Sequence, residues 1–182
     1  MAEVIDMART TIDLTQLIRA SQTEGRIDVV ELAKKLNLNV YAIKLPSDSS
    51  GCIKWNAQAS QGCIEVNAAH PVTRQRFTIA HELAHYLKHP QVLKQKGRLD
   101  RSHTFKSDQE IKREHQADKE AAAILMPEYL VQDYCKQQAW GKKTKLTSDM
   151  ISEIAATFRV SRAMTVMRLR ELGFHIPYIS FA

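Results

Sequence analysis

The sequence lacks the cysteine pairs that a disulfide framework would need. It contains three cysteines, an odd number, and no CxxC spacing joins any of them: Cys52, Cys63 and Cys135. Dispersed, unpaired cysteines are typical of a protein from a reducing compartment. None has a neighbour that indicates a catalytic thiol, so we predict three free thiols that pack in the core.

Long apolar runs are missing as well. No apolar stretch approaches the length of a bilayer-spanning helix, and the opening residues, MAEVIDMARTTIDL, lack the basic start and apolar run of a signal peptide. Apolar residues make up 44% of the chain and charged residues 25%, fractions that argue against long disordered segments. We therefore expect a cytoplasmic protein with one compact fold.

Acidic residues are too few to balance the basic ones, which leaves a net charge of +6 and a pI near 9.3. The densest basic runs are KQKGR at 94–98, GKKTK at 141–145 and the arginines near the C-terminus. Such a charge suits contact with nucleic acid or an acidic partner. Solvated loops explain it about as well, so both interpretations stay open.

Residue spacing predicts an α+β fold that is mostly helical with a small sheet. Asp13 and Asp28 are expected N-caps of two helices within residues 13–37. A strand ended by Pro46 follows, and the segments CIKWN and GCIEVN indicate a pair of short strands. The remaining expected elements are helices over 71–89, 108–125 and 128–140, two helices within 148–173, and a loop or irregular lid over 91–109.

The segment FTIAHELAHYLKH, residues 77–89, places polar groups in an otherwise apolar helix. At about 100° per residue, His85 lies about 40° from His81 and Glu82 about 100° from it, so the three share one wedge. Imidazoles at i and i+4 can reach one metal ion, and the carboxylate between them can reach a water on that ion. The alternative is a core helix whose histidines are satisfied by backbone carbonyls.

A catalytic zinc site of this kind needs a third protein ligand, and the segment REHQADKEAAAILMP offers one. Glu114 can complete the site, and Asp118, one turn later on the same face, can accept the free ring N–H of a ligating histidine. The alanines near that face let the two helices approach closely: Ala117, Ala121 and Ala122.

HELAH followed by E-x-x-x-D on a later helix resembles the thermolysin-type arrangement of zinc peptidases. The segments GCIEVN, RQRFTIAHELAHYLKH and EHQADKEAAAILMP further resemble the ImmA/IrrE family of metallo-endopeptidases, over roughly residues 27–174. The resemblance implies a zincin-like peptidase core at 1–145 and a helix-turn-helix-like segment packed on it at 146–182. The sequence differs from the family pattern at two positions: at Ala84 the family usually has glycine, and at Glu120 it usually has phenylalanine.

Carried over residue by residue, the resemblance assigns His81, His85 and Glu114 to the metal and Glu82 to acid–base catalysis. The expected ion is Zn²⁺, although Mn²⁺ or iron suits the same ligands. In the resulting mechanism Glu82 takes a proton from the attacking water and gives it to the leaving amine, so a peptide bond is hydrolysed without a serine or cysteine nucleophile.

Two parts of the site stay open at this stage. The donor that stabilises the oxyanion could be any of four residues that are close in sequence only: Tyr86, His89, His103 and His115. A substrate could add as a strand at the edge of the small sheet, with residues 63–67 as the candidate edge.

The C-terminal segment ISEIAATFRVSRAMTVMRLRELG resembles a helix-turn-helix with its turn near Arg159 and Val160. DNA binding through Arg162, Arg168 and Arg170 is one interpretation; helices that pack on the core with solvated arginines are the other. The chain ends shortly after this segment, so we expect any inducing signal to act through the core or a partner.

The family resemblance implies cleavage of a helix-turn-helix repressor of the Xre type, with relief of transcriptional repression. The alternative is a non-catalytic regulator or toxin–antitoxin component that keeps the metal for structure and works by binding protein or DNA. An intact Glu82 favours the peptidase, because a structural metal site needs no base there.

Overall fold

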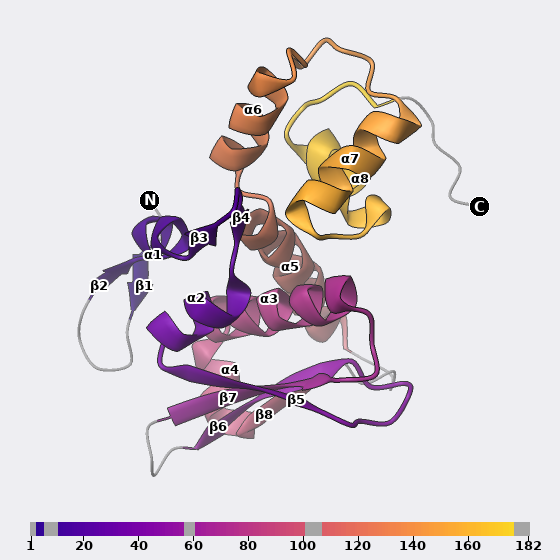
Figure 1. The fold of residues 1–182 in the computed structure, drawn as a ribbon. Coiled ribbons are helices and arrows are strands. Elements are labelled where there is room, and N and C mark those ends of the chain that lie inside the picture. Colours follow the sequence, from indigo (N-terminus) through magenta and orange to yellow (C-terminus); the bar gives the residue numbers. More distant parts are fainter. Residues whose placement is uncertain (1–2, 6–10, 57–60, 101–106, 177–182) are drawn as a thin grey trace.

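Helices dominate the α+β fold of the computed structural model, which describes residues 3–5, 11–56, 61–100 and 107–176 (Figure 1). The helices are α1 Leu14–Ala20, α2 Val29–Lys35, α3 Val72–Lys88, α4 Pro90–Lys96, α5 Asp108–Leu125, α6 Glu128–Gln137, α7 Ser148–Phe158 and α8 Arg162–Glu171. The strands are β1 Glu3–Ile5, β2 Thr11–Asp13, β3 Gln22–Thr23, β4 Arg26–Ile27, β5 Leu38–Ile43, β6 Gly51–Asn56, β7 Gln61–Asn67 and β8 Arg98–Asp100. None of the described helices has both the length and the apolar character that a membrane crossing requires.

Local capping explains why the predicted helices begin where they do. Asp13 accepts backbone N–H groups at the start of α1, and Asp28 does the same for α2, as the sequence predicts. At α5, the Ser107 hydroxyl and the Glu110 carboxylate form a reciprocal capping box. Pro71, which has no N–H to leave unsatisfied, precedes α3. The two long helices therefore occupy the predicted residues.

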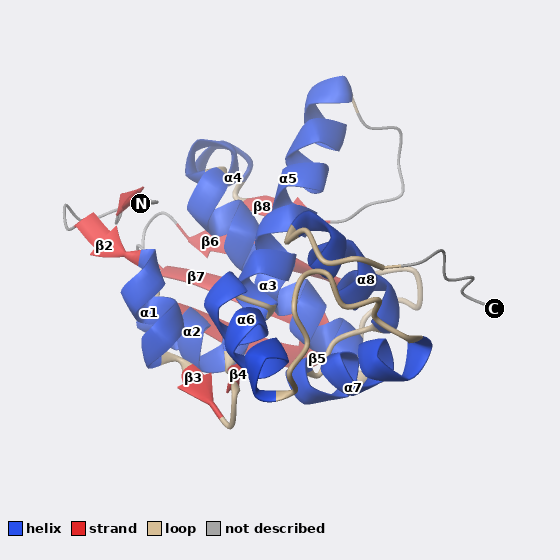
Figure 2. Ribbon diagram, turned by 90° about the horizontal axis from the view of Figure 1, so that it is seen from above, coloured by secondary structure: helices blue, strands red, loops and turns tan. Residues whose placement is uncertain are grey.

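The main sheet has four strands in the order β5-β7-β6-β8, with β5 parallel to β7 and the other pairs antiparallel. Helices α2, α3 and α4 lie along one face of this sheet (Figures 1 and 2). The predicted pairing of CIKWN with GCIEVN is confirmed as β6 with β7.

Two sequence-based predictions about this region are wrong. Residues 63–67 offer no edge to a substrate, because β7 is paired on both sides. In the sheet, β7 lies between β5 and β6, the two strands that precede it in sequence. Residues 91–109 do not form one long loop, because Pro90 starts α4 as well as ending α3. The buried Leu93 anchors α4, Gly97 ends it with φ +67°, and β8 follows.

Helix α3 lies unusually close to the sheet at one glycine. A Cβ atom built on Gly51 would stand 2.6 Å from the Thr78 side chain and 2.4 Å from the carbonyl oxygen of Glu65. Only glycine fits between helix and strand there, because real Cβ atoms do not approach other atoms so closely. This contact holds the centre of α3, which carries the predicted metal ligands, against β6.

The three cysteines are free thiols, as predicted. Cys52 and Cys135 are buried, and burial raises the pKa of each thiol to about 11. Cys63 is only half-buried, so the core position predicted for all three holds for two of them.

The C-terminal helices pack against the rest of the molecule. Phe158, Met164 and Leu169 belong to the same buried cluster as the residues of α3 and α5. Arg168 lies within this packing, where its Nε donates to the carbonyl of Met126 at 3.0 Å. The turn between α7 and α8 falls at Arg159 and Val160, where the sequence places it, and Arg159 adopts φ +51°.

We predict that Arg168→Met lowers the free energy of unfolding by about 2 kcal/mol, because a buried carbonyl loses a charged hydrogen-bond donor. Arg170→Met is the matched control: this arginine is exposed on the same helix, and its loss should change stability by no more than about 0.5 kcal/mol. Urea denaturation of both variants tests this. Equal stability losses would show that the Arg168 contact adds nothing.

Candidate metal centre

Helix α3 carries three polar side chains in the middle of its buried face. His81 and Glu82 are each 1% exposed and His85 is 4% exposed, among apolar neighbours such as Ala80 and Leu83 at 0%. Polar groups at such depth are costly unless they find partners. The partners come from α5, which packs along α3 (Figure 2).

The atoms of His81, His85 and Glu114 that could bind a metal converge on one point. The two imidazole Nε2 atoms lie 3.0 Å apart, and the Glu114 oxygens lie 3.5 Å from Nε2 of His81 and 3.3 Å from Nε2 of His85. All three donors lie within 4.8 Å of one another. In a tetrahedral site with bonds of about 2.0–2.1 Å, neighbouring donors stand about 3.3–3.4 Å apart. The donor set and its spacing therefore fit a divalent metal ion such as zinc.

Asp118 orients one of these imidazoles. Its Oδ1 lies 2.9 Å from Nδ1 of His81, on the side of the ring opposite to the converging nitrogen. A carboxylate can only accept, so Nδ1 of His81 carries the hydrogen and Nε2 keeps its lone pair. The contact also makes the ring more electron-rich, which strengthens it as a metal ligand.

Glu114 is held in its ionised form. Burial alone would raise the pKa of this carboxyl, but its contacts with His81 and His85 outweigh burial and hold the pKa well below the usual range. A carboxylate that stays charged is a ready ligand for a cation. Two imidazoles and one carboxylate are a donor set that is also found in catalytic zinc sites.

Glu82 follows His81 directly on α3 and is as deeply buried as that histidine. Burial raises the pKa of the Cys52 thiol to about 11, and the negative charges of Glu65 and Glu82 act in the same direction. Helix α3, which carries Glu82, packs against β6, which contains Cys52. The Glu82 carboxylate is not one of the three converging donors.

The four candidates for the oxyanion donor have different surroundings. Tyr86 packs its ring on Trp55, with centroids 6.2 Å apart, and His115 is exposed. His103 lies outside the described residues. His89 continues the histidine row one turn beyond His85, with ring centroids 5.5 Å apart, and burial lowers its pKa. The i+4 spacing from His85 is the signal that places His89 beside the site.

Glu120, the residue that departs from the family pattern, has a clear role in packing. Its Oε1 forms an ion pair with Nζ of Lys88 at 3.1 Å, which links α5 to the last turn of α3. The acid therefore joins the same two helices that carry the site. It does so away from the metal-binding atoms.

Comparison with known proteins supports this description. The family profile of peptidase M78, the IrrE N-terminal-like domain, matches residues 33–170. No curated protein gives a significant match. Among solved structures, a Mycobacterium tuberculosis transcriptional regulator is similar in fold, with a TM-score of 0.57 and 16% identity over 90% of this chain and 46% of that one. The chain thus spans less than half the length of that regulator.

We predict that Asp118→Asn weakens metal binding about 10- to 100-fold, because His81 loses the carboxylate that fixes its tautomer. Glu120→Gln is the matched control on the same helix, since its carboxylate contacts Lys88. Competition with a chromophoric zinc chelator measures both affinities. Unchanged affinity in the Asp118 variant, or an equal loss in both, would contradict the orienting role.

Proposed function

Because the chain belongs to the IrrE N-terminal-like family of metallopeptidases, we propose that it is an endopeptidase whose metal ion is held by His81, His85 and Glu114. The observation that carries the proposal is the convergence of these three donors from two separate helices. We propose Zn²⁺ as the ion, and Mn²⁺ or iron can occupy the same donor set. When bound, such an ion supplies Lewis acidity for a water and for the scissile carbonyl.

Glu82 acts as the general base and then as the general acid. Its carboxylate accepts a proton from the attacking water and passes it to the leaving amine nitrogen. Glu82 is 1% exposed, so bulk water competes little with the groups at the site for its proton. His81 and His85 stay neutral during this exchange, with Asp118 holding the tautomer of His81.

The substrate binds as an added strand along β8. This strand pairs with β6 on one side, and no described strand pairs with its other side. Asp100 of β8 is the register partner of Cys52 on β6, and β6 packs against α3, the helix that carries Glu82. A peptide paired with β8 would therefore run past the base, and its backbone hydrogen bonds would require no particular side chain.

The proposed substrate is a helix-turn-helix repressor of the Xre type, cut in the cytoplasm to relieve repression. The family resemblance suggests this class of substrate. We assign the peptidase core to residues 1–145 and treat residues 146–182 as a helix-turn-helix-like segment packed on it. To cleave a repressor, the protein needs a surface on which the repressor docks. It does not need this segment to contact DNA.

The alternative is a non-catalytic regulator or toxin–antitoxin component that acts by binding protein or DNA. The DNA-binding interpretation depends on three arginines: Arg162, Arg168 and Arg170. Arg162 donates to the Ser148 hydroxyl at 2.6 Å, and Arg168 donates to Met126 and pairs with Glu171. Two of the three arginines are thus occupied within the protein, which favours the peptidase over the DNA-binding alternative.

We predict that Glu82→Gln lowers kcat/KM for cleavage about 10²- to 10⁴-fold and leaves metal binding intact, because only the base is lost. Glu114→Gln should lose metal and cleavage together. The test substrate is a purified helix-turn-helix repressor of the Xre type, and its cleavage is followed by gel electrophoresis and mass spectrometry. Loss of cleavage with unchanged derepression of a reporter would support the non-catalytic alternative, and full cleavage by the Glu82 variant would contradict the role of Glu82 as the base.

A further inference from the structure

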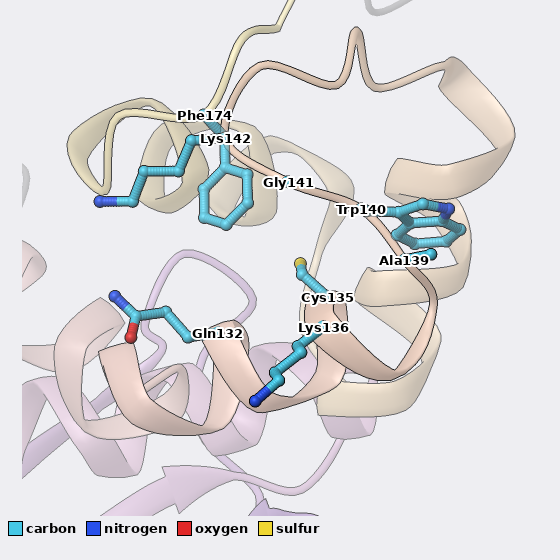
Figure 3. Close-up of a pocket in the computed structure, with 8 residues that line it drawn as sticks. All are labelled: Gln132, Cys135, Lys136, Ala139, Trp140, Gly141, Lys142 and Phe174. Carbon is cyan, nitrogen blue, oxygen red and sulfur yellow. The ribbon is translucent and has the colours of Figure 1, made fainter.

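A second concave site lies far from the metal centre, between α6 and the residues that follow α8. Its volume is about 390 Å³, and it is lined by Gln132, Cys135, Lys136, Ala139, Trp140, Gly141, Lys142 and Phe174 (Figure 3). This size is within the usual range for small-molecule sites. Gly141 and Lys142, which begin the basic run at 141–145, line one side, and the peptidase mechanism has no use for this run.

The centre of this cavity is apolar and aromatic. The Cys135 sulfur points from α6 toward the Phe174 ring, and Trp140 stands at one end (Figure 3). Cys135 is 1% exposed and Phe174 6%, so both belong to the packed interior that forms the floor. Aromatic rings and a thiol sulfur are favourable neighbours for another aromatic ring.

The opposite end of the cavity is polar and positively charged. The Lys142 ammonium and the Gln132 amide lie at the end away from Trp140 (Figure 3). None of the ion pairs in the described part of the chain involves Lys136 or Lys142. Of the residues that the structure describes, no acidic one lines the cavity, and the Gln132 side chain donates through Nε2 to Oε1 of Glu128, one turn earlier on α6, at 2.7 Å.

Backbone hydrogen bonds fix the segments that form the walls of the cavity. The Trp140 N–H donates to the Cys135 carbonyl at 2.8 Å, which fixes the turn after α6. His175 N–H donates to the Lys142 carbonyl and Leu146 N–H to the His175 carbonyl, each at 3.2 Å. A preformed site loses little entropy on binding.

We propose that this cavity binds a small aromatic carboxylate, with the acid group at Lys142 and the ring between Cys135, Phe174 and Trp140. A neutral aromatic molecule would leave the lysine without a partner. An inorganic anion would leave the aromatic floor in contact with water. A nucleic acid would use the charge and not the enclosed apolar floor.

Fluorescence titration with 4-phenylbutyrate tests the proposal. The chain has two tryptophans, so Trp55→Phe leaves Trp140 as the sole reporter inside the cavity. The emission of Trp140 should change saturably with phenylbutyrate, several-fold more weakly with 4-phenylbutanol, and not at all with acetate. Calorimetry on the unmodified chain repeats the titration without the tryptophan substitution.

Substitutions of charged residues near the cavity test where the carboxylate of the ligand binds. Lys142→Gln should weaken phenylbutyrate binding about three- to fivefold, and Lys143→Gln, on the same loop but outside the cavity, should not. Glu128→Gln should tighten binding, since it removes a negative charge next to Gln132. Equal effects of the two lysine variants, equal binding of alcohol and carboxylate, or a response to duplex DNA in place of phenylbutyrate would overturn the proposal.

Discussion

The close packing of α5 against α3 is the constraint on which the rest of the structure depends. Glu114 and Asp118 reach the histidines only because Ala117 and Ala121, on the same face at helical spacing, leave no side chain beyond Cβ. Gly51 fixes the other side of α3 against β6. A larger side chain at Ala117 or Ala121 would separate the helices, and overpacking of this kind typically costs about 1–3 kcal/mol. It would also pull the carboxylate of Glu114 away from both imidazoles.

The same packing explains how the core tolerates its polar wedge. His81, Glu82 and His85 are almost wholly buried, and buried polar groups without partners are destabilising. Contacts with Glu114 and Asp118 satisfy part of this requirement from the neighbouring helix. The remaining stability comes from apolar packing around the wedge, including Leu83 and Ala122. Stability of the fold and geometry of the site therefore depend on one helix pair.

Local sequence patterns predicted this helix pair well, because they act within a few residues. The 3.6-residue period places His81 beside His85 and Glu114 beside Asp118, and Pro71 marks where the first of these helices begins. Strand order could not be derived in this way. It depends on contacts between distant segments, and neither the composition nor the spacing of residues 61–67 indicates that β7 lies between β5 and β6. The cavity at Phe174 was missed for the same reason, since its walls are about 40 residues apart in sequence.

The C-terminal segment is best understood as a structural part of the peptidase fold. Arg76, on α3 just ahead of the metal ligands, donates through Nη2 to the carbonyls of Ile27 at 2.9 Å and Phe158 at 3.5 Å. Arg168 on α8 binds the carbonyl of Met126, which directly follows α5. Each of the two site helices is thus tied by an arginine to α7 or α8. The inner face of α7 and α8, including Arg168, is thus engaged in packing. Any movement of this segment, including one caused by a ligand between α6 and Phe174, would act on the ends of the helices that hold the metal site.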